Sequence, residues 1–120
     1  MNFKQTTPIL RIFDEVKAKE FYVDFLGFTV DWEHRFAEDM PLYMQVSRAG
    51  CTIHLSEHHG DCFPGAAMRI ETIDLDGLHS ELTAKDYKYC RPGIEDMPWG
   101  TRDMKVGDPF GNRLIFTCPI

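Results

Sequence analysis

The sequence predicts an α+β fold made of two tandem β-α-β-β-β modules, and three observations lead to this prediction. The second half of the chain repeats the pattern of the first at a shift of about 60 residues, so that residues 7–14 correspond to 67–74. The Gly-led stretch 50–55 likewise corresponds to 111–116. In each half an apolar run ends in Asp, a helix-like stretch follows, and the Gly-led strand closes the unit.

Module one is expected over about residues 6–57. Its first strand, 9–13, is rich in β-branched and aromatic residues, as strands generally are. Asp14 is placed to cap a helix over 15–26, and Gly27 is placed to end it. Three further strands are expected at 28–33, 42–47 and 51–56.

A linker with Gly and Pro, at about 58–66, leads to module two, which is expected over about 67–118. The elements expected in it are a strand at 67–73, a helix at 75–85, and strands at 88–90, 102–106 and 113–118. Residues 108–112 form a turn before the last strand, because Pro presets one turn position and Gly is free to take positive φ at another.

The composition indicates one globular domain over residues 1–120. Hydrophobic residues make up 43% of the chain and charged residues 27%, so the chain is neither disordered nor fibrous. The net charge of −6 and the lack of a basic stripe argue against a nucleic-acid partner, since nothing would neutralise phosphates. No apolar run has signal-peptide or membrane-spanning length, so we expect a cytoplasmic protein with no membrane partner. The four cysteines form no Cys-x-x-Cys pair and are expected to stay free thiols.

Three groups of residues carry a resemblance to a known family. They are Phe21-Tyr22 followed by Leu26-Gly27-Phe28, Pro98-Trp99-Gly100 followed by Arg102, and Asp108-Pro109-Phe110-Gly111-Asn112. In this order and at this spacing the whole chain resembles the glyoxalase / bleomycin resistance protein / dioxygenase (vicinal oxygen chelate) superfamily. The last two motifs, together with the chain length, are most similar to the bleomycin resistance protein branch.

The resemblance implies that each module contributes a curled half-barrel, and that the protein is a homodimer whose ligand grooves form between subunits. It implies a function as well: the protein would bind and sequester a planar or cationic small molecule, such as a glycopeptide-type antibiotic, with no cofactor and no catalysis. The alternative is a metal-dependent glyoxalase or dioxygenase of the same superfamily that uses His54 as one ligand. A third hypothesis is a domain that serves only in protein interactions.

The metal question depends on four positions. In the metalloenzymes of this superfamily the ligands lie on the first and fourth strands of each module. The repeat places these positions at Thr7 and Ala67, and at His54 and Ile115. Only His54 is of a usual ligand type, whereas a catalytic divalent site needs three or more protein ligands. We therefore expect no metal site.

Charged residues on the first strand of each module are candidates for a polar site. Alternation along these strands places an apolar set under the helices, which leaves Arg11, Arg69 and Glu71 facing inward. Long charged side chains rarely turn inward without partners. They would orient a polar ligand, or Arg11 and Glu71 would form an ion pair across the module interface. Both interpretations remain open at this point.

Aromatic residues complete the candidate site. By resemblance, Trp32 and Trp99 line the groove for a flat ligand, with Phe36 on a nearby loop. Facing rings suit planar ligands by stacking and cations by attraction to the ring face; alternatively, each Trp fills the core or a dimer interface. The remaining residues of the predicted ligand-binding set, which align near groove positions of the family, are Asp31, His54 and Ser56.

Overall fold

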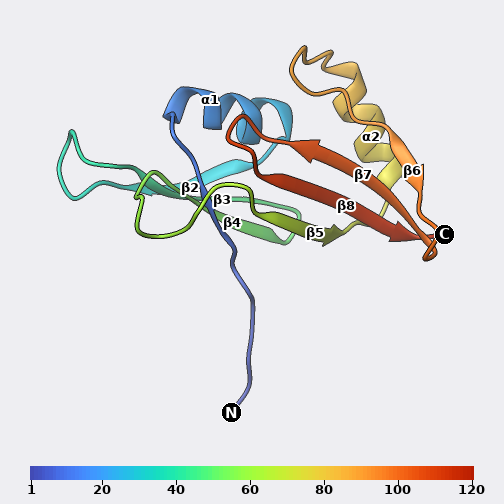
Figure 1. Cartoon of the computed structure of the whole chain (residues 1–120), viewed down its shortest axis with the longest axis horizontal. Coiled ribbons are helices and arrows are strands. Elements are labelled where there is room, and N and C mark those ends of the chain that lie inside the picture. Colours follow the sequence, from blue (N-terminus) through green and yellow to red (C-terminus); the bar gives the residue numbers. More distant parts are fainter. The chain divides into compact units, whose positions relative to one another are not determined.

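The computed structural model describes all 120 residues, and the chain divides into two compact units, Met1–Pro64 and Gly65–Ile120. Each unit contains one four-stranded mixed sheet, in the order strand, helix, three strands (Figure 1). This order confirms the predicted α+β class with two tandem β-α-β-β-β modules, whose sheets are curled rather than closed. The expectation that residues 1–120 form a single domain with a linker at about 58–66 stays a prediction.

The sheet of unit 1, residues Met1–Pro64, has the strand order β1-β4-β3-β2. Its strands are β1 (Ile9–Arg11), β2 (Thr29–His34), β3 (Tyr43–Arg48) and β4 (Cys51–Ser56). Strand β1 runs parallel to β4, and the other neighbours are antiparallel. The β3–β4 hairpin turns at Ala49 and Gly50, whose φ angles of 50° and 87° are the positive values that a two-residue hairpin turn requires.

The helix of unit 1 changes its winding halfway. It begins as α1 (Glu15–Lys19), capped by Asp14, whose carboxylate accepts a 2.8 Å hydrogen bond from the backbone N–H of Lys17. It continues as a π-helix, η1 (Glu20–Phe25), so the regular α-helix predicted over 15–26 is wrong in its second half. The wider winding turns the helix less per residue than the roughly 100° of an α-helix. Adjacent residues therefore share the buried side, which is formed by Ala18, Phe21, Tyr22, Phe25 and Leu26.

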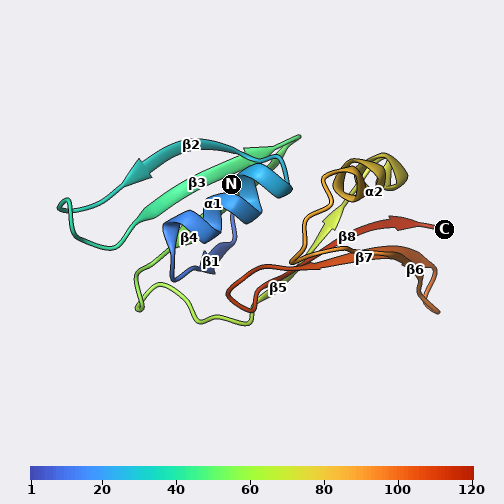
Figure 2. The ribbon, with the colours of Figure 1, turned by 90° about the horizontal axis from the view of Figure 1, so that it is seen from above.

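Alternation along the strands gives the sheet of unit 1 a covered face and an open face. The covered face lies under α1 and η1 (Figure 2). Its fully buried side chains are Met44, Val46, Ile53 and Leu55, together with Leu10 at 3% exposure. We call the opposite side the open face of unit 1, because no helix of this unit covers it.

Unit 2, residues Gly65–Ile120, repeats this plan with the strand order β5-β8-β7-β6. Its elements are β5 (Ala67–Glu71), α2 (Leu75–Ala84), β6 (Ile94–Asp96), β7 (Thr101–Gly107) and β8 (Arg113–Pro119). Asp74 caps α2 by accepting a 3.0 Å hydrogen bond from Gly77, and the helix lies against one face of the sheet (Figure 2). The buried core of the unit contains Leu75, Leu82, Met104, Val106, Leu114 and Phe116. None of the helices is long and apolar enough to cross a membrane.

Strand β6 lies at Ile94–Asp96, so the strand predicted at 88–90 is wrong. Those residues form a turn after α2, in which the N–H of Cys90 donates to the carbonyl of Tyr87 at 3.3 Å. Pairing with β7 begins only after Pro92, because proline has no N–H for a sheet ladder. Residues 88–90 therefore form the turn that follows α2, despite the β propensity of Tyr89 and Cys90.

The turn before β8 is held by the side chain of Asp108. One carboxylate oxygen accepts hydrogen bonds from the backbone N–H groups of Phe110 (2.9 Å) and Asn112 (2.8 Å). The other accepts from the Asn112 side-chain amide at 2.8 Å. Asn112 is fully buried, and its side-chain oxygen accepts from the N–H of Ala66 at 3.3 Å. The motif therefore fixes the start of β5 beside β8.

We predict that Asp108→Ala lowers the free energy of unfolding by about 2–4 kcal/mol, because the buried donors of Asn112 lose their acceptor. Urea denaturation of the purified variants measures this change. Glu38→Ala, in an exposed loop, is the matched control and is expected to change stability by less than about 0.5 kcal/mol. Equal stabilities for the two variants would contradict the role given to Asp108.

Candidate functional site

The open face of unit 1 collects most of the residues that the sequence marks as candidates in this unit. Strand register places Gln45 opposite His54, and His54 opposite Ile9. Counting by two along each strand places on this face the side chains of Ile9, Arg11, Thr29, Trp32, His34, Tyr43, Gln45, Ser47, Thr52, His54 and Ser56. The face is thus aromatic and polar, in contrast to the aliphatic face under the helix.

A β-bulge in β2 brings Trp32 to this face. Val30 pairs with Val46, but Trp32 pairs with Gln45, so one extra residue, Asp31, is inserted between the two pairs. In a regular strand Val30 and Trp32 would point the same way. The bulge reverses the alternation: Val30 stays on the covered side, and Trp32 and His34 turn to the open face.

Three rings form a cluster on the open face, which we call the ring cluster: Trp32, Tyr43 and His54. Trp32 stacks on Tyr43 with ring centroids 5.9 Å apart and an angle of 11° between the planes. His54 meets both rings edge-on, at 5.3 Å from Trp32 and 5.2 Å from Tyr43. Trp32 is 42% exposed, so part of its indole is in contact with solvent.

A chain of hydrogen bonds, which includes two of these rings, joins residues of three strands. The hydroxyl of Tyr43 lies 2.7 Å from Nδ1 of His54, and Nε2 of His54 lies 2.9 Å from Oε1 of Gln45. Nε2 of Gln45 donates to the carboxylate of Asp31 at 3.0 Å. Both ring nitrogens of His54 are therefore engaged by protein groups.

The charge states of Asp31 and Tyr43, the two ends of the hydrogen-bond chain, follow from their surroundings. Hydrogen bonds from Gln45 and Ser47 lower the pKa of Asp31, so its carboxylate stays ionised at neutral pH. Burial, followed by the nearby carboxylate of Asp61, raises the pKa of Tyr43, so its phenol keeps its proton. The chain thus runs from a protonated hydroxyl to an ionised acid.

Phe36 lies apart from the ring cluster, on the loop between β2 and β3. Its ring is 77% exposed and meets two imidazoles edge-on, His34 at 4.8 Å and His58 at 6.0 Å. Because His34 follows Trp32 by two residues on the open face, these three rings extend the aromatic surface beyond the ring cluster.

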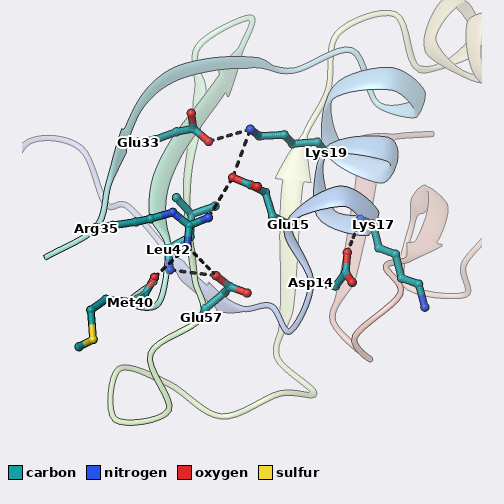
Figure 3. Close-up of polar contacts among 9 residues, drawn as sticks. All are labelled: Asp14, Glu15, Lys17, Lys19, Glu33, Arg35, Met40, Leu42 and Glu57. Atoms are coloured by element: carbon teal, nitrogen blue, oxygen red, sulfur yellow. Dashed lines mark hydrogen bonds and ion pairs between the residues drawn. The ribbon is translucent and has the colours of Figure 1, made fainter. Parts of the chain in front are cut away.

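Arg35 ties the base of this loop to two other elements (Figure 3). Its guanidinium donates to the carbonyl of Met40 at 2.8 Å and to the carboxylate of Glu15 in α1 at 3.1 Å. Glu57, which lies 3.7 Å from the same guanidinium, accepts a 2.9 Å hydrogen bond from the N–H of Leu42. Both ends of the loop are thereby anchored, and Phe36 projects from a fixed base.

The two remaining candidates of unit 1 have partners within the protein. The guanidinium of Arg11 lies 4.6 Å above the ring of Phe13. Ser56 is fully buried; its hydroxyl donates to Asp61 at 2.6 Å and accepts from the N–H of His58 at 3.0 Å. That Ser56 contacts a ligand stays a prediction.

In unit 2 the partner of Arg69 is Asp103. The guanidinium donates to both carboxylate oxygens at 3.1 Å and to the hydroxyl of Thr117 at 3.0 Å. Asp103 is 1% exposed and also accepts from Thr117 at 2.6 Å and Thr101 at 3.0 Å. The hydrogen bonds from Arg69, and then from Thr117, lower the pKa of Asp103 to about 2.

The other candidates of unit 2 are exposed. Glu71 ends β5, and Trp99 lies in the loop between β6 and β7 at 64% exposure. The structure therefore brings together Asp31, Trp32 and His54 and places Phe36 on the same loop-and-strand surface. That Arg69, Glu71 and Trp99 join them, and that Arg11 pairs with Glu71, stay predictions, because these residues belong to different units.

The residues at the superfamily's metal positions do not fit a divalent ion. Thr7, Ala67 and Ile115 supply no imidazole, carboxylate or thiolate, and three such ligands are the usual minimum. The remaining one, His54, has both ring nitrogens in hydrogen bonds with Tyr43 and Gln45. Metal binding at His54 would have to break one of these bonds.

Sequence reasoning missed Tyr43 and Gln45, although a signal for them was present. The short turn at Ala49 and Gly50 makes Arg48 pair with Cys51, and counting back along both strands puts Gln45 opposite His54. Tyr43 then follows on the same face. The pairing of Asp103 with Arg69 could not be found by counting along a hairpin, because the two residues lie on β7 and β5, which are separated by β8.

The fold and the site together define a class of protein: two β-α-β-β-β modules with curled sheets, each with a helix-covered and an open face. The sequence profile of a family described as "glyoxalase superfamily protein" matches residues 1–119. The chain therefore belongs to the glyoxalase superfamily, as the motifs around Trp99 and Asp108 predicted. No curated protein matches the chain.

Solved structures of other proteins are similar to this chain over almost its whole length. A bleomycin-binding protein from bleomycin-producing Streptomyces verticillus, complexed with copper(II)-bleomycin, has 28% identity and a TM-score of 0.72, with 100% of this chain and 99% of that chain covered. TnmS3, an antibiotic binding protein from Streptomyces sp. CB03234, has 23% identity, a TM-score of 0.74 and the same coverage. A superfamily member from Sphaerobacter thermophilus DSM 20745 has 23% identity, a TM-score of 0.71 and 97% coverage of both chains. The last two show likeness of fold alone.

The low pKa of Asp103 predicts how stability depends on pH. Because its folded pKa of about 2 lies below the usual value of about 3.9, its stabilising effect is complete above about pH 5 and is lost as the pH falls towards 2. Asp103→Asn is therefore expected to lower the urea midpoint at pH 7, and its difference from the wild type should shrink between about pH 4 and pH 2.

Urea midpoints measured across this pH range test the prediction. Asp39→Asn, in an exposed loop, serves as the control and should show a small, pH-independent difference. A constant gap between Asp103→Asn and the wild type down to the lowest pH would contradict the ion pair with Arg69.

Proposed function

We propose that this protein binds a planar or cationic small molecule, such as a glycopeptide-type antibiotic like bleomycin, and acts by sequestering it rather than by metal catalysis. The observation that carries the proposal is the exposed ring cluster, in which Trp32 lies stacked on Tyr43. Support comes from the likeness over the full chain, at 28% identity, to a bleomycin-binding protein. The energetics would be those of stacking, charge complementarity and desolvation.

Charge supports a cationic ligand. Unit 1 carries ten Asp and Glu against six Lys and Arg, a net charge of −4 within the chain's −6. One of these acids, Asp31, lies at the rim of the ring cluster and is fixed by Gln45. Aromatic faces attract cations as well, so the rings and the acid favour the same kind of ligand.

We also place the ligand groove between the subunits of a homodimer, with Trp99 facing the ring cluster across it. Support for self-association comes from exposed apolar side chains after the first strand of each unit. Phe13 is 55% exposed and Ile73, its counterpart in the repeat, is 99% exposed. Contiguous apolar patches mark protein interfaces, and in the proposed dimer these two side chains would each join such a patch.

We predict that Trp99→Ala and Trp32→Ala each weaken binding of metal-free bleomycin by about 1–3 kcal/mol, as expected for the loss of an aromatic anchor. Isothermal titration calorimetry measures the affinities. Tyr89→Ala, which removes an exposed ring at 69% exposure outside the proposed site, is the matched control and should bind like the wild type.

Fluorescence gives an independent readout, because the chain contains two tryptophans. Trp32→Phe leaves only Trp99 as a reporter, and Trp99→Phe leaves only Trp32. Both reporters should change emission at saturating ligand. Unchanged affinity in both alanine variants would refute the proposed function.

We predict that the protein elutes in size-exclusion chromatography with light scattering at twice its chain mass of 13.9 kDa. The reason is that the open sheet faces and the exposed apolar groups need a cover that a second chain supplies. A monomer at micromolar concentration, with bleomycin still bound, would remove the intersubunit groove from the proposal but leave the ring cluster as its site.

A further inference from the structure

The acceptor-only carboxylate of Asp31 sets the direction of the hydrogen-bond chain on the open face of unit 1 when His54 is neutral. The carboxylate of Asp31 can only accept, so the amide nitrogen of Gln45 donates to it at 3.0 Å. The amide oxygen of Gln45 then faces Nε2 of His54 at 2.9 Å. Because an amide oxygen can only accept, Nε2 of His54 carries the hydrogen.

The position of the hydrogen on His54 also determines the direction of its hydrogen bond with Tyr43. In a neutral imidazole with its hydrogen on Nε2, the other nitrogen, Nδ1, is an acceptor. The Tyr43 hydroxyl, 2.7 Å from this nitrogen, must therefore donate its hydrogen to His54. The phenol oxygen of Tyr43 is left with lone pairs and no hydrogen for a ligand.

Tyr43 and Asp31, the two ends of the hydrogen-bond chain, consequently present only acceptors beside the rings. Tyr43 offers its phenol oxygen, and Asp31, which is exposed, offers its carboxylate. His54 offers neither a donor nor an acceptor, because both of its nitrogens are used. The donors in the neighbourhood are the second amide hydrogen of Gln45, the indole N–H of Trp32, and the guanidinium of Arg11 on β1, the strand next to that of His54.

We propose that the open face of unit 1 selects flat ligands that carry an N–H donor at their edge, and that Gln45 is a positioning residue that acts through His54 on Tyr43. The inference rests on the proposed function and deepens it, since it names the chemistry of the ligand's edge. Stacking on Trp32 is available to any flat molecule, so the acceptors set the preference among flat molecules.

The preference for donor-bearing ligands follows from the desolvation cost that a flat ligand without a donor would cause. A flat molecule without a donor would cover the Tyr43 oxygen and the Asp31 carboxylate and take their remaining lone pairs out of water without a partner. Leaving a polar group buried without a partner is costly, and sites that hydrogen-bond a ligand group reject analogues that lack it. A donor-bearing ligand avoids this cost and, when cationic, also meets the negative charge of unit 1.

The test compares two neutral probes of nearly equal shape, 2-aminobenzothiazole and 2-methylbenzothiazole, titrated into the full chain and followed by NMR. The amino probe should bind the wild type at least about fivefold more tightly. Tyr43→Phe, which removes the phenol hydroxyl and with it the acceptor offered to the ligand, should bring the two affinities within about twofold of each other. Gln45→Leu should act in the same direction, and Tyr89→Phe, the control, should keep the wild-type ratio.

A spectroscopic readout separates positioning from a general structural effect. Long-range ¹H–¹⁵N NMR of the wild type should show His54 as the tautomer with hydrogen on Nε2, and Gln45→Leu should convert it to a mixture. If Gln45→Leu does not fold, Tyr43→Phe and the wild-type tautomer carry the test.

Each outcome decides the inference. Equal affinities for the two probes, with binding still dependent on Trp32, would overturn it and leave the proposed function standing. Hydrogen on Nδ1 of His54 in the wild type would overturn the direction of the chain and the inference with it. Absence of binding by either probe, together with no binding of bleomycin, would overturn the inference and the proposed function together.

Discussion

The period-two alternation of the strands is the constraint on which the rest of this structure depends. Each sheet has one face packed under a helix, and burial without water requires that face to be aliphatic. Met44, Val46, Ile53 and Leu55 meet this requirement in unit 1 at 0% exposure. The intervening residues of β1, β3 and β4 are then directed to the opposite face, and the bulge in β2 adds Trp32 to it. The candidate site thus follows from how the core is built, together with one extra residue in β2.

The polar groups of the open faces are held by one another. Asp103 is almost fully buried yet accepts from Arg69, Thr117 and Thr101, so its charge is compensated within unit 2. In unit 1 the chain from Tyr43 to Asp31 engages both nitrogens of His54. Side chains that satisfy each other in this way are rigid before a ligand arrives, which reduces the entropy lost on binding. The same bonds explain why the single histidine at a superfamily metal position is poorly suited to hold an ion.

Much of the fold could be predicted from the sequence, because internal repetition and alternation are encoded locally. The strand at 51–56 and the cap Asp14 were both predicted from local residues and confirmed. The failures have non-local causes. The π-helical winding of Glu20–Phe25 and the position of β6 depend on packing and on pairing with β7. The bulge at Asp31, which turns Trp32 to the open face, leaves no clear mark in the sequence, and the pairing of Arg69 with Asp103 joins strands far apart in the chain.

The central claim is that the open face of unit 1, and not its helix-covered face, takes the ligand. The two indole N–H signals of Trp32 and Trp99 in a ¹H–¹⁵N spectrum of the labelled protein test it most directly, since the chain contains no other tryptophan. On titration with metal-free bleomycin, the account predicts a saturable shift of the Trp32 signal, with little change in the amides of α1. A Trp32 signal that stays in place while the amides of α1 shift would contradict it.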